Sequence, residues 1–192
     1  MPKTRLEAFT DAVIAIIMTI LVLDLAVPAQ PTFAALWDLR FKFLIYILSF
    51  VSLAIYWNNH HHLFQISKII NGKILWYNMA FILFLSLFPF VTAWVDEHIL
   101  ERAPEITYGI VILLADIAYA LLARALVKAN GPDSEIAKAL RGYQKSKLTL
   151  CIICAGLIIG IFVPVAVIIS VAASLVLWII PEKRIESRLI HG

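Results

Sequence analysis

Residues 5–24 read RLEAFTDAVIAIIMTILVLD, an apolar run with an acid near its start. A helix needs about 20 apolar residues to cross the hydrocarbon core of a membrane, and this run has that length. Because successive helical residues are about 100° apart, one narrow stripe is formed by Arg5, Phe9, Ile16, Ile20 and Leu23. Thr19 lies at the edge of this stripe, and Asp11 lies on the far side. The stretch predicts a transmembrane helix whose apolar stripe and acid face different directions.

The overall composition predicts a protein that crosses a membrane several times. Hydrophobic residues make up 62% of the 192 residues and charged residues 15%, whereas an ordinary soluble domain is about 45–50% apolar. The net charge of +3 by itself also fits a nucleic-acid partner. The basic residues, however, sit at the ends of apolar runs and form no patch of their own. Membrane orientation explains them better, so we expect no nucleic-acid partner.

Six apolar runs have about the length of a transmembrane helix. They lie near residues 6–26, 41–62, 74–95, 105–127, 146–163 and 164–181. The last two are short and meet at Pro164, which is acceptable in the first turn of a helix, so they predict a tight hairpin. We therefore expect one all-α, six-helix membrane domain over residues 1–192.

The charges of the connecting segments predict that both termini are cytoplasmic. In this orientation the inner side carries Lys3, Arg5, Lys68, Lys73, Arg124, Lys128, Lys138, Arg141, Lys145, Lys147, Lys183, Arg184 and Arg188. The outer side has Arg40, Lys42 and Arg102, together with Asp24, Asp38, Asp96, Glu97, Glu101 and Glu105. This distribution follows the positive-inside rule. The acidic outer rim either gathers cations at an entrance or is an ordinary solvated face, and both interpretations remain open.

Three sets of polar residues lie at membrane depth, all on the cytoplasmic side. They are Arg5, Thr10 and Asp11 in the first run; Trp57, Asn58, Asn59, His60, His61 and His62 in the second; and Asn78 in the third. An unpaired carboxylate there is costly, so we expect Asp11 to accept a hydrogen bond from the second or third helix. The favoured role is a structural link between helices. The alternative is a proton relay, because a histidine beside a carboxylate titrates near neutral pH.

Other polar and reactive residues indicate their roles less specifically. Adjacent residues point about 100° apart, so His60, His61 and His62 are poorly spaced for a metal site. His61 is four residues after Trp57 and is therefore the histidine expected to turn inward. Asp116, in the middle of the fourth run, is either functional or bonded to a neighbouring helix. Cys151 and Cys154 predict buried, reduced thiols.

A catalytic constellation is not evident in the sequence. There is no nucleophile with a base, no phosphate-binding loop and no credible set of metal ligands, so we expect neither an enzyme nor a cofactor. On spacing alone, Ile16, Ile20 and Leu23 favour a helix-packing face over any other role.

A family resemblance changes that interpretation of the stripe. Arg5-x-x-x-Phe9-Thr10-Asp11 resembles the Arg-x-x-x-Phe-Ser-Asp signature of the transmembrane protein 175 family of potassium channels. Tyr56-Trp57 followed by His61 is similar to the family's second-helix pattern, and Asn78 with Pro89 to its third. The resemblance covers roughly the first half of the chain. Thr10 replaces the usual serine and keeps the hydroxyl group.

The resemblance implies a homotetramer of six-helix subunits, with the first helix of each subunit lining a central pore. It implies that Ile16, Ile20 and Leu23 are the apolar pore positions and that Ile16 is the main constriction. It also implies an inter-helix network formed by Arg5, Phe9, Thr10, Asp11, Trp57, His61 and Asn78.

The function expected from this resemblance is passive, potassium-selective conduction across a prokaryotic plasma membrane, with monovalent cations and membrane lipids as partners. Stacked apolar rings can close such a pore by expelling water. Selectivity arises either from partial dehydration of the ion or from Thr19 hydroxyl groups. The alternative is a proton-coupled transporter using Asp11, His61 and Asp116, although the paired repeats and discontinuous helices of many transporters are not evident. A membrane scaffold is a third possibility.

Overall fold

The structure is a computed structural model that describes residues 2–141 and 145–179. Its helices are α1 (Lys3–Leu23), α2 (Phe33–Asp38), α3 (Arg40–Gln65), α4 (Gly72–Leu85), α5 (Phe88–Glu97), α6 (Arg102–Asn130), α7 (Glu135–Leu140), α8 (Lys145–Gly160) and α9 (Val165–Ile179). No strand occurs within the described ranges, so the all-α class is confirmed. Lys183, Arg184, Arg188 and the last two residues of the predicted 164–181 helix lie outside these ranges.

Four segments of the described chain are long and apolar enough to cross a membrane. They are α1, α3, the combined segment Gly72–Glu97, and α6. The chain is therefore an integral membrane protein. The described parts of α8 and α9, with 16 and 15 residues, are shorter than the roughly 20 residues of a full span. A count of six transmembrane helices stays a prediction.

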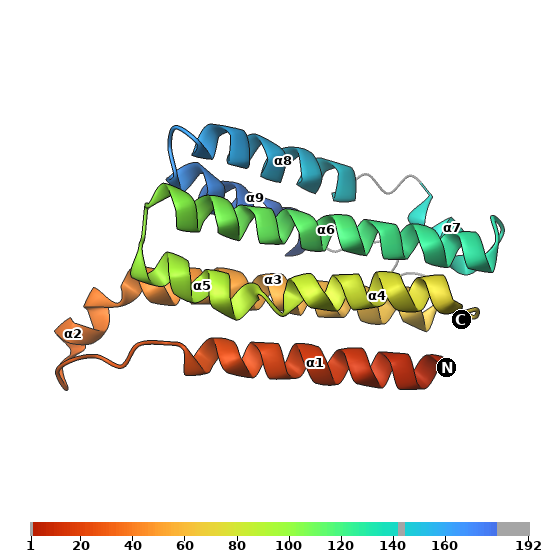
Figure 1. Cartoon of the computed structure of the whole chain (residues 1–192), viewed down its shortest axis with the longest axis horizontal. Helices are drawn as coiled ribbons and strands as arrows, with labels where there is room; N and C mark the ends of the chain where they lie inside the picture. Colours follow the sequence, from red (N-terminus) through yellow and green to blue (C-terminus); the bar gives the residue numbers. More distant parts are fainter. Residues whose placement is uncertain (1, 142–144, 180–192) are drawn as a thin grey trace.

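The helices lie side by side in layers, with α1 along one edge of the bundle (Figure 1). α1 packs on α3, α4 and α5, and beyond them α6 packs on α4, α5, α8 and α9. The short α2 lies in the connection between α1 and α3, at the end of the bundle away from the N-terminus. Helix α1 is thus supported from one side only.

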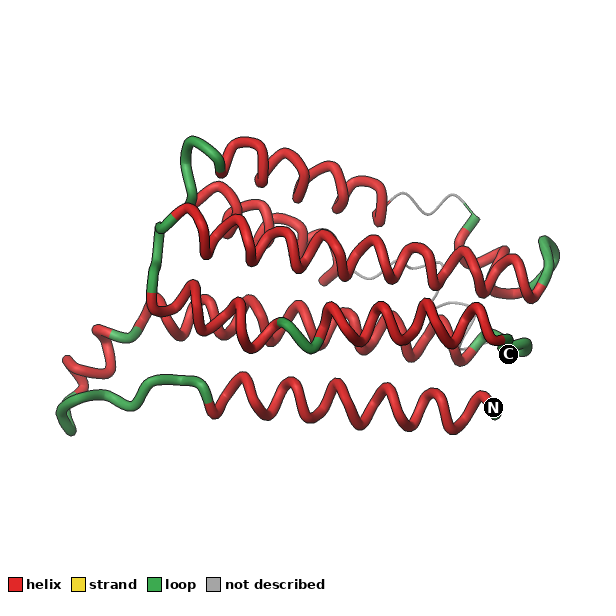
Figure 2. Tube along the Cα trace, in the orientation of Figure 1, coloured by secondary structure: helices red, strands yellow, loops and turns green. Residues whose placement is uncertain are grey.

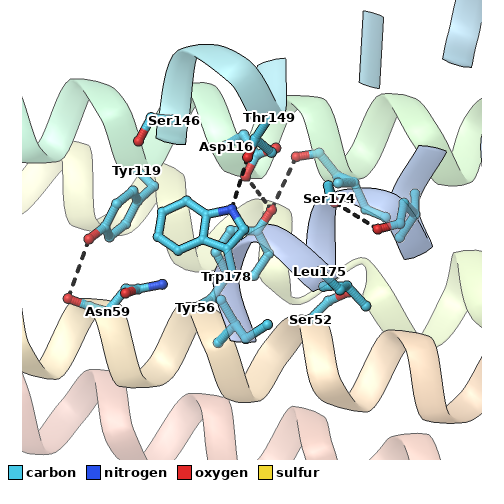
Figure 3. Close-up of a pocket in the computed structure, with 13 residues that line it drawn as sticks. Ser52, Tyr56, Asn59, Asp116, Tyr119, Ser146, Thr149, Ser174, Leu175 and Trp178 are labelled. Carbon is cyan, nitrogen blue, oxygen red and sulfur yellow. Dashed lines mark hydrogen bonds between the residues drawn. The ribbon is translucent and has the colours of Figure 1, made fainter. Parts of the chain in front are cut away.

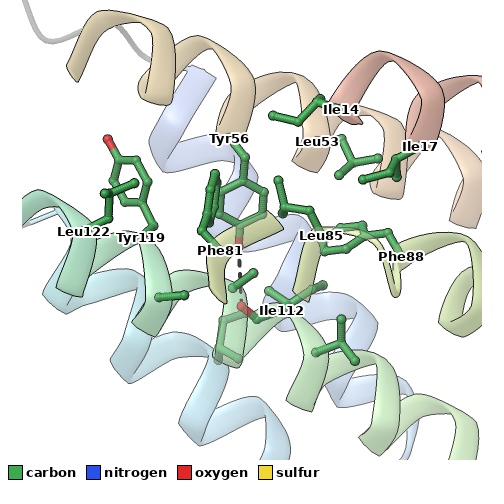
Figure 4. Close-up of a cluster of buried hydrophobic side chains, with 14 of the residues drawn as sticks. Ile14, Ile17, Leu53, Tyr56, Phe81, Leu85, Phe88, Ile112, Tyr119 and Leu122 are labelled. Atoms are coloured by element: carbon green, nitrogen blue, oxygen red, sulfur yellow. Dashed lines mark hydrogen bonds between the residues drawn. The ribbon is translucent and has the colours of Figure 1, made fainter. Parts of the chain in front are cut away.

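The inner face of α1 follows directly from its sequence. Its buried residues are Leu6, Thr10, Ile14, Ile17 and Leu21. They are spaced three or four residues apart, so they form a single stripe along the helix. Figure 4 shows Ile14 and Ile17 of this stripe next to Leu53 of α3. The stripe residues Ile16, Ile20 and Leu23 are left on the opposite side.

An aromatic cluster fills the centre of the bundle between α3, α4, α5 and α6 (Figure 4). The Tyr56 ring meets the rings of Phe81 and Phe88 edge-on, with centroids 5.7 Å and 6.1 Å apart. The Tyr119 ring lies 5.8 Å from Phe81. Such tilted and edge-to-face pairs are favourable geometries for aromatic rings. The cluster thus joins α3, α4, α5 and α6, three of which (α3, α4 and α5) α1 packs on.

The predicted helix at 74–95 is interrupted between α4 and α5, as the short green segment in Figure 2 shows. Pro89 lacks the N–H that would bond to the Leu85 carbonyl, and its ring crowds that carbonyl. Backbone carbonyl groups in the turn before Pro89 accept hydrogen bonds from nearby residues instead. Leu87 N–H donates to the Phe84 carbonyl at 3.2 Å, and Ser86 Oγ donates to the Leu83 carbonyl at 2.7 Å. The two halves continue in nearly the same direction.

The hairpin of α8 and α9 is held by close contact between small residues. The inward face of α8 is Thr149, Ile153, Gly156 and Gly160. A Cβ atom at Gly160 would lie 2.5 Å from Cγ2 of Val167, and one at Gly156 would collide with Ser170. These glycines therefore let the two helices approach more closely than any other residue would.

The prediction that Cys151 and Cys154 are buried is wrong. Both are free thiols on the exposed side of α8. The inward positions of the helix are 149, 153, 156 and 160, and neither cysteine falls on that face.

Replacing Gly156 with alanine is expected to destabilise the protein by about 1–3 kcal/mol, because the new methyl group collides with Ser170. Thermal unfolding of the purified protein in detergent measures this as a lower melting temperature. Gly72→Ala is the matched control, since a Cβ atom there meets nothing within 4 Å. Equal melting temperatures for the two variants would contradict the packing argument.

Candidate functional site

The outward face of α1 is apolar and uncovered. The exposed fractions are 59% for Ile16, 41% for Ile20, 76% for Leu23 and 47% for Phe9. Arg5 is exposed on the same face. In a membrane-spanning helix such an apolar face meets either lipid or another helix. The structure thus places the predicted stripe away from the core of the helix bundle, where it is free to meet another surface.

Thr19 lies beside Ile20 on this face and is also exposed. Its hydroxyl donates a hydrogen bond to the Ala15 carbonyl at 2.8 Å. Because the hydroxyl proton is used within the helix, Oγ1 keeps only lone pairs for outside partners. Thr19 therefore offers an oxygen acceptor at an otherwise apolar level.

A buried chain of hydrogen bonds joins α1 to α4 and α3. Asn78 Nδ2 donates to Thr10 Oγ1 at 2.8 Å, and that hydroxyl donates to the Leu6 carbonyl at 2.9 Å. His60 Nε2 lies 2.8 Å from Asn78 Oδ1. The amide oxygen only accepts, so His60 carries its proton on Nε2. The side chains of Thr10, His60 and Asn78 are at most 1% exposed.

Asp11 makes a second connection at the same level, nearer the surface. Trp57 Nε1 donates to Asp11 Oδ1 at 3.0 Å. His61 stacks on the Trp57 ring, with centroids 5.8 Å apart. Asp11 and His61 are therefore both next to Trp57, on the side of α3 that faces α1.

The expectation that His61 turns inward is wrong, because His60 is the buried histidine. The inward face of α3 runs through Leu53, Tyr56, His60 and Phe64, which are spaced three or four residues apart. His60 stacks on Phe64 with centroids 4.3 Å apart. His61 is one position further around the helix and is exposed. Tyr56, His60 and Phe64 are spaced four residues apart, but so are Trp57 and His61, so spacing alone does not identify the buried histidine.

Arg5 and Phe9 are not joined to this network within the described part of the chain. Both side chains lie on the outward face of α1, opposite the buried Thr10. Within the described residues, Arg5 has no side-chain partner.

A second buried layer was not foreseen from the sequence. Ser49 Oγ lies 2.8 Å from Thr92 Oγ1 and 3.0 Å from the Tyr108 hydroxyl, so the three groups join α3, α5 and α6. Single serine and threonine residues in apolar helices carry almost no sequence signal, since each can also bond to its own helix backbone.

Asp116 lies apart from the α1 network, in a small cavity between α3, α6, α8 and α9 (Figure 3). The Tyr56 hydroxyl donates to Asp116 Oδ1 at 2.7 Å. Trp178 Nε1 donates to Thr149 Oγ1 at 2.9 Å across the same cavity. The cavity has a volume of about 30 Å³, which is enough for water molecules. Asp116 thus bonds to a neighbouring helix, and the structure does not bring it together with Asp11 and His61.

Two acids of the predicted outer rim are buried within the helix bundle. Asp96 is 9% exposed and Glu105 is fully buried. Asp96 continues the buried face of α5 formed by Val91, Thr92 and Val95. The acids that remain exposed at this end are Asp24, Asp38, Glu97 and Glu101. The rim is therefore less acidic at its surface than the sequence suggested.

Comparison with known proteins gives matches that extend from part of the chain to nearly all of it. The family model described as "Endosomal/lysosomal potassium channel TMEM175" matches residues 5–89. A protein named potassium channel from Chryseobacterium sp. is 40% identical over 189 residues, which is 98% of this chain and 98% of the relative. One of the same description from Streptomyces collinus is 30% identical over 126 residues, covering 64% of this chain and 61% of the relative.

A solved structure has the same fold. The crystal structure of a lysosomal potassium-selective channel TMEM175 homolog from Chamaesiphon minutus superposes with a TM-score of 0.75. The match covers 92% of this chain and 94% of the other, at 24% sequence identity. The helical arrangement described above is therefore shared with that protein.

Replacing Asn78 with leucine is expected to destabilise the protein by about 1–3 kcal/mol, because buried hydrogen-bonding groups of Thr10 and His60 lose their partner. Thermal unfolding in detergent measures the effect. Asn58→Leu is the control, because it makes the same substitution at an exposed asparagine, in α3. If both variants melted at the same temperature, the Asn78 amide would not be the link between α1, α3 and α4.

Proposed function

Because this chain belongs to the family of the endosomal/lysosomal potassium channel TMEM175, we propose that it is a potassium-selective channel that conducts ions passively through a pore lined by α1. The relative from Chryseobacterium, which is named a potassium channel, matches over nearly the full length of both chains. Relatives with these names are channels, which supports conduction over an enzymatic activity.

The observation that carries the proposal is the uncovered apolar face of α1. One protomer supplies one stripe, so a closed pore needs a ring of subunits. A cyclic homotetramer would bring four copies of each α1 position together around one axis. Arg5 and Phe9, which are exposed on the same face, would then meet neighbouring subunits. The proposed tetramer accounts for a surface that a lone protomer leaves open.

The proposed gate consists of three apolar rings. At about 1.5 Å per residue, Ile20 lies about 6 Å along the helix from Ile16, and Leu23 about 4.5 Å further. Rings of this kind exclude water when the pore is narrow and conduct when the helices move apart. We propose Ile16 as the principal constriction.

Selectivity needs a further explanation, because isoleucine and leucine side chains have no oxygens to replace a hydration shell. Partial dehydration at the apolar rings is one explanation. The competing explanation is Thr19, whose exposed Oγ1 has lone pairs available beside Ile20. Substitution of Thr19 distinguishes partial dehydration from coordination by Thr19.

The hydrogen bonds of α1 to α3 and α4 hold the apolar stripe in its orientation. Thr10 and Asp11 are bonded to Asn78 and Trp57, so α1 cannot rotate without breaking hydrogen bonds at membrane depth. Breaking them there is costly, because the hydrocarbon core provides no water as a substitute. We propose that Thr10, Asp11, Trp57 and Asn78 position the pore helix and take no part in conduction.

The distribution of charge supports a cytoplasmic location for both termini, as proposed for a prokaryotic plasma membrane. Described basic residues gather where α1 and α4 begin and α3 and α6 end; they include Lys3, Arg5, Lys68, Lys73, Arg124 and Lys128. The opposite end has Arg40, Lys42 and Arg102. This is the asymmetry of the positive-inside rule.

The transporter alternative has less support. It requires Asp11, His61 and Asp116 to act together, yet Asp11 and His61 lie beside Trp57 while Asp116 bonds to Tyr56. Asp116 lines a separate cavity between α3, α6, α8 and α9, and neither Asp11 nor His61 lines it.

Replacing Ile16 with asparagine is expected to lower the potassium-to-sodium permeability ratio severalfold, because the amide oxygen at the constriction coordinates either ion. Planar-bilayer recording of the purified protein in asymmetric potassium and sodium measures the reversal potential. Ile169→Asn is the control, since Ile169 of α9 is 60% exposed, close to the 59% of Ile16. An unchanged reversal potential in the Ile16 variant would remove Ile16 from the filter. Absence of wild-type current together with pH-dependent flux into vesicles would favour the transporter.

Replacing Thr19 with alanine is expected to lower the same permeability ratio, because the pore loses its side-chain oxygen acceptors. Thr107→Ala is a matched control, as Thr107 of α6 also donates to the carbonyl four residues earlier, at 2.8 Å. An unaltered ratio in the Thr19 variant would leave partial dehydration at the apolar rings as the source of selectivity.

A further inference from the structure

A basic groove lies between α4 and α6, at the end of the bundle where the chain begins. It is formed by Lys73 and Tyr77 of α4 and by Leu121, Arg124 and Lys128 of α6, and it has a volume of about 460 Å³. Arg124 and Lys128 also border a second hollow of about 470 Å³ toward α7, which includes Arg141. The two cations of α6 thus stand between two adjoining hollows.

The positive charge of this groove is not balanced by the described part of the protein. No aspartate or glutamate lines either hollow. The ion pairs formed among described residues are Lys3 with Glu7 and Lys138 with Glu135, so the groove cations take part in neither. Cations held close together repel one another, and an anion placed between them relieves that repulsion.

The groove continues into an apolar track along α6. Ile110, Ile117 and Leu121 are 42%, 40% and 37% exposed. They precede Arg124 and Lys128 on the same side of the helix, because all five are spaced three, four or seven residues apart. The surface of α6 thus changes from apolar to basic along its length. Trp76 of α4, 78% exposed near the basic end, is the kind of residue found at the membrane interface.

We propose that this groove binds an anionic phospholipid. The phosphate group contacts Lys73, Arg124 and Lys128, and an acyl chain lies along Leu121 and Ile117. A phospholipid matches this surface along its length. Its apolar chains lie at membrane depth, as the apolar track does, and its charged head group lies at the interface, as the cations do. A soluble anion would use the cations and leave the apolar track unoccupied.

The site is separate from the proposed pore. α6 lies beyond α3, α4 and α5 as seen from α1 (Figure 1), so a lipid here leaves the α1 face unobstructed. The proposal requires only that the protein is embedded in a membrane, and it holds whether or not the chain conducts ions.

Native mass spectrometry of the detergent-purified protein, titrated with phosphatidylglycerol or phosphatidylcholine, tests the proposal. The wild type is expected to bind phosphatidylglycerol more tightly. Arg124→Gln/Lys128→Gln is expected to weaken that binding at least about tenfold and to leave phosphatidylcholine unaffected. Arg124→Lys/Lys128→Arg, which keeps both charges, is expected to retain binding. Equal affinity of the wild type for the two lipids would overturn the proposal.

Two controls separate a defined site from general attraction and from a free-anion site. Lys138→Gln/Lys147→Gln removes the same net charge outside the α4–α6 groove, and is expected to change affinity by less than about twofold. An equal loss in both double variants would indicate diffuse attraction and refute the site. Glycerol phosphate, which lacks acyl chains, is expected not to displace the lipid at equal concentration; displacement would refute the lipid assignment.

Discussion

The buried amide of Asn78 is the point at which three membrane helices are joined by hydrogen bonds. It donates to Thr10 of α1 and accepts from His60 of α3, so one side chain of α4 satisfies polar groups on both neighbours. In water such an arrangement competes with solvent, whereas at membrane depth the alternative is an unsatisfied polar group. The orientation of α1, and with it the direction in which its apolar stripe points, depends on this connection.

Features that depend on the spacing of residues along one helix could be predicted from the sequence. The all-α class follows from runs of apolar residues of membrane length, and the two faces of α1 follow from three- and four-residue spacings. The placement of Thr10, Asp11, Trp57 and Asn78 at one level follows from their depth in consecutive antiparallel helices. In each case, the information lies within one segment or in the order of segments.

Features that depend on how one helix sits against another could not be predicted in this way. His60 and His61 differ by a rotation of about 100°, and only the packing of α3 against Phe81 and α1 decides which is buried. The exposure of Cys151 and Cys154 follows from the face that α8 turns toward α9. The bonds of Ser49 to Thr92 and Tyr108 join residues far apart in sequence. Pro89 interrupts the predicted helix 74–95 between α4 and α5, whereas a proline in a membrane helix need not break it, because neighbouring groups can satisfy the freed carbonyl.

The single rigid helix that contains both the hydrogen-bonded anchor and the apolar stripe limits how the length of this chain can change in evolution. One residue inserted between Thr10 and Ile16 would rotate everything after it by about 100° and turn Ile16 and Ile20 away from their present direction. A deletion would do the same in the opposite sense. The connection between α1 and α2, residues 24–32, lies beyond both features. Length variation among descendants of this sequence should therefore accumulate there, while the spacing within α1 stays constant.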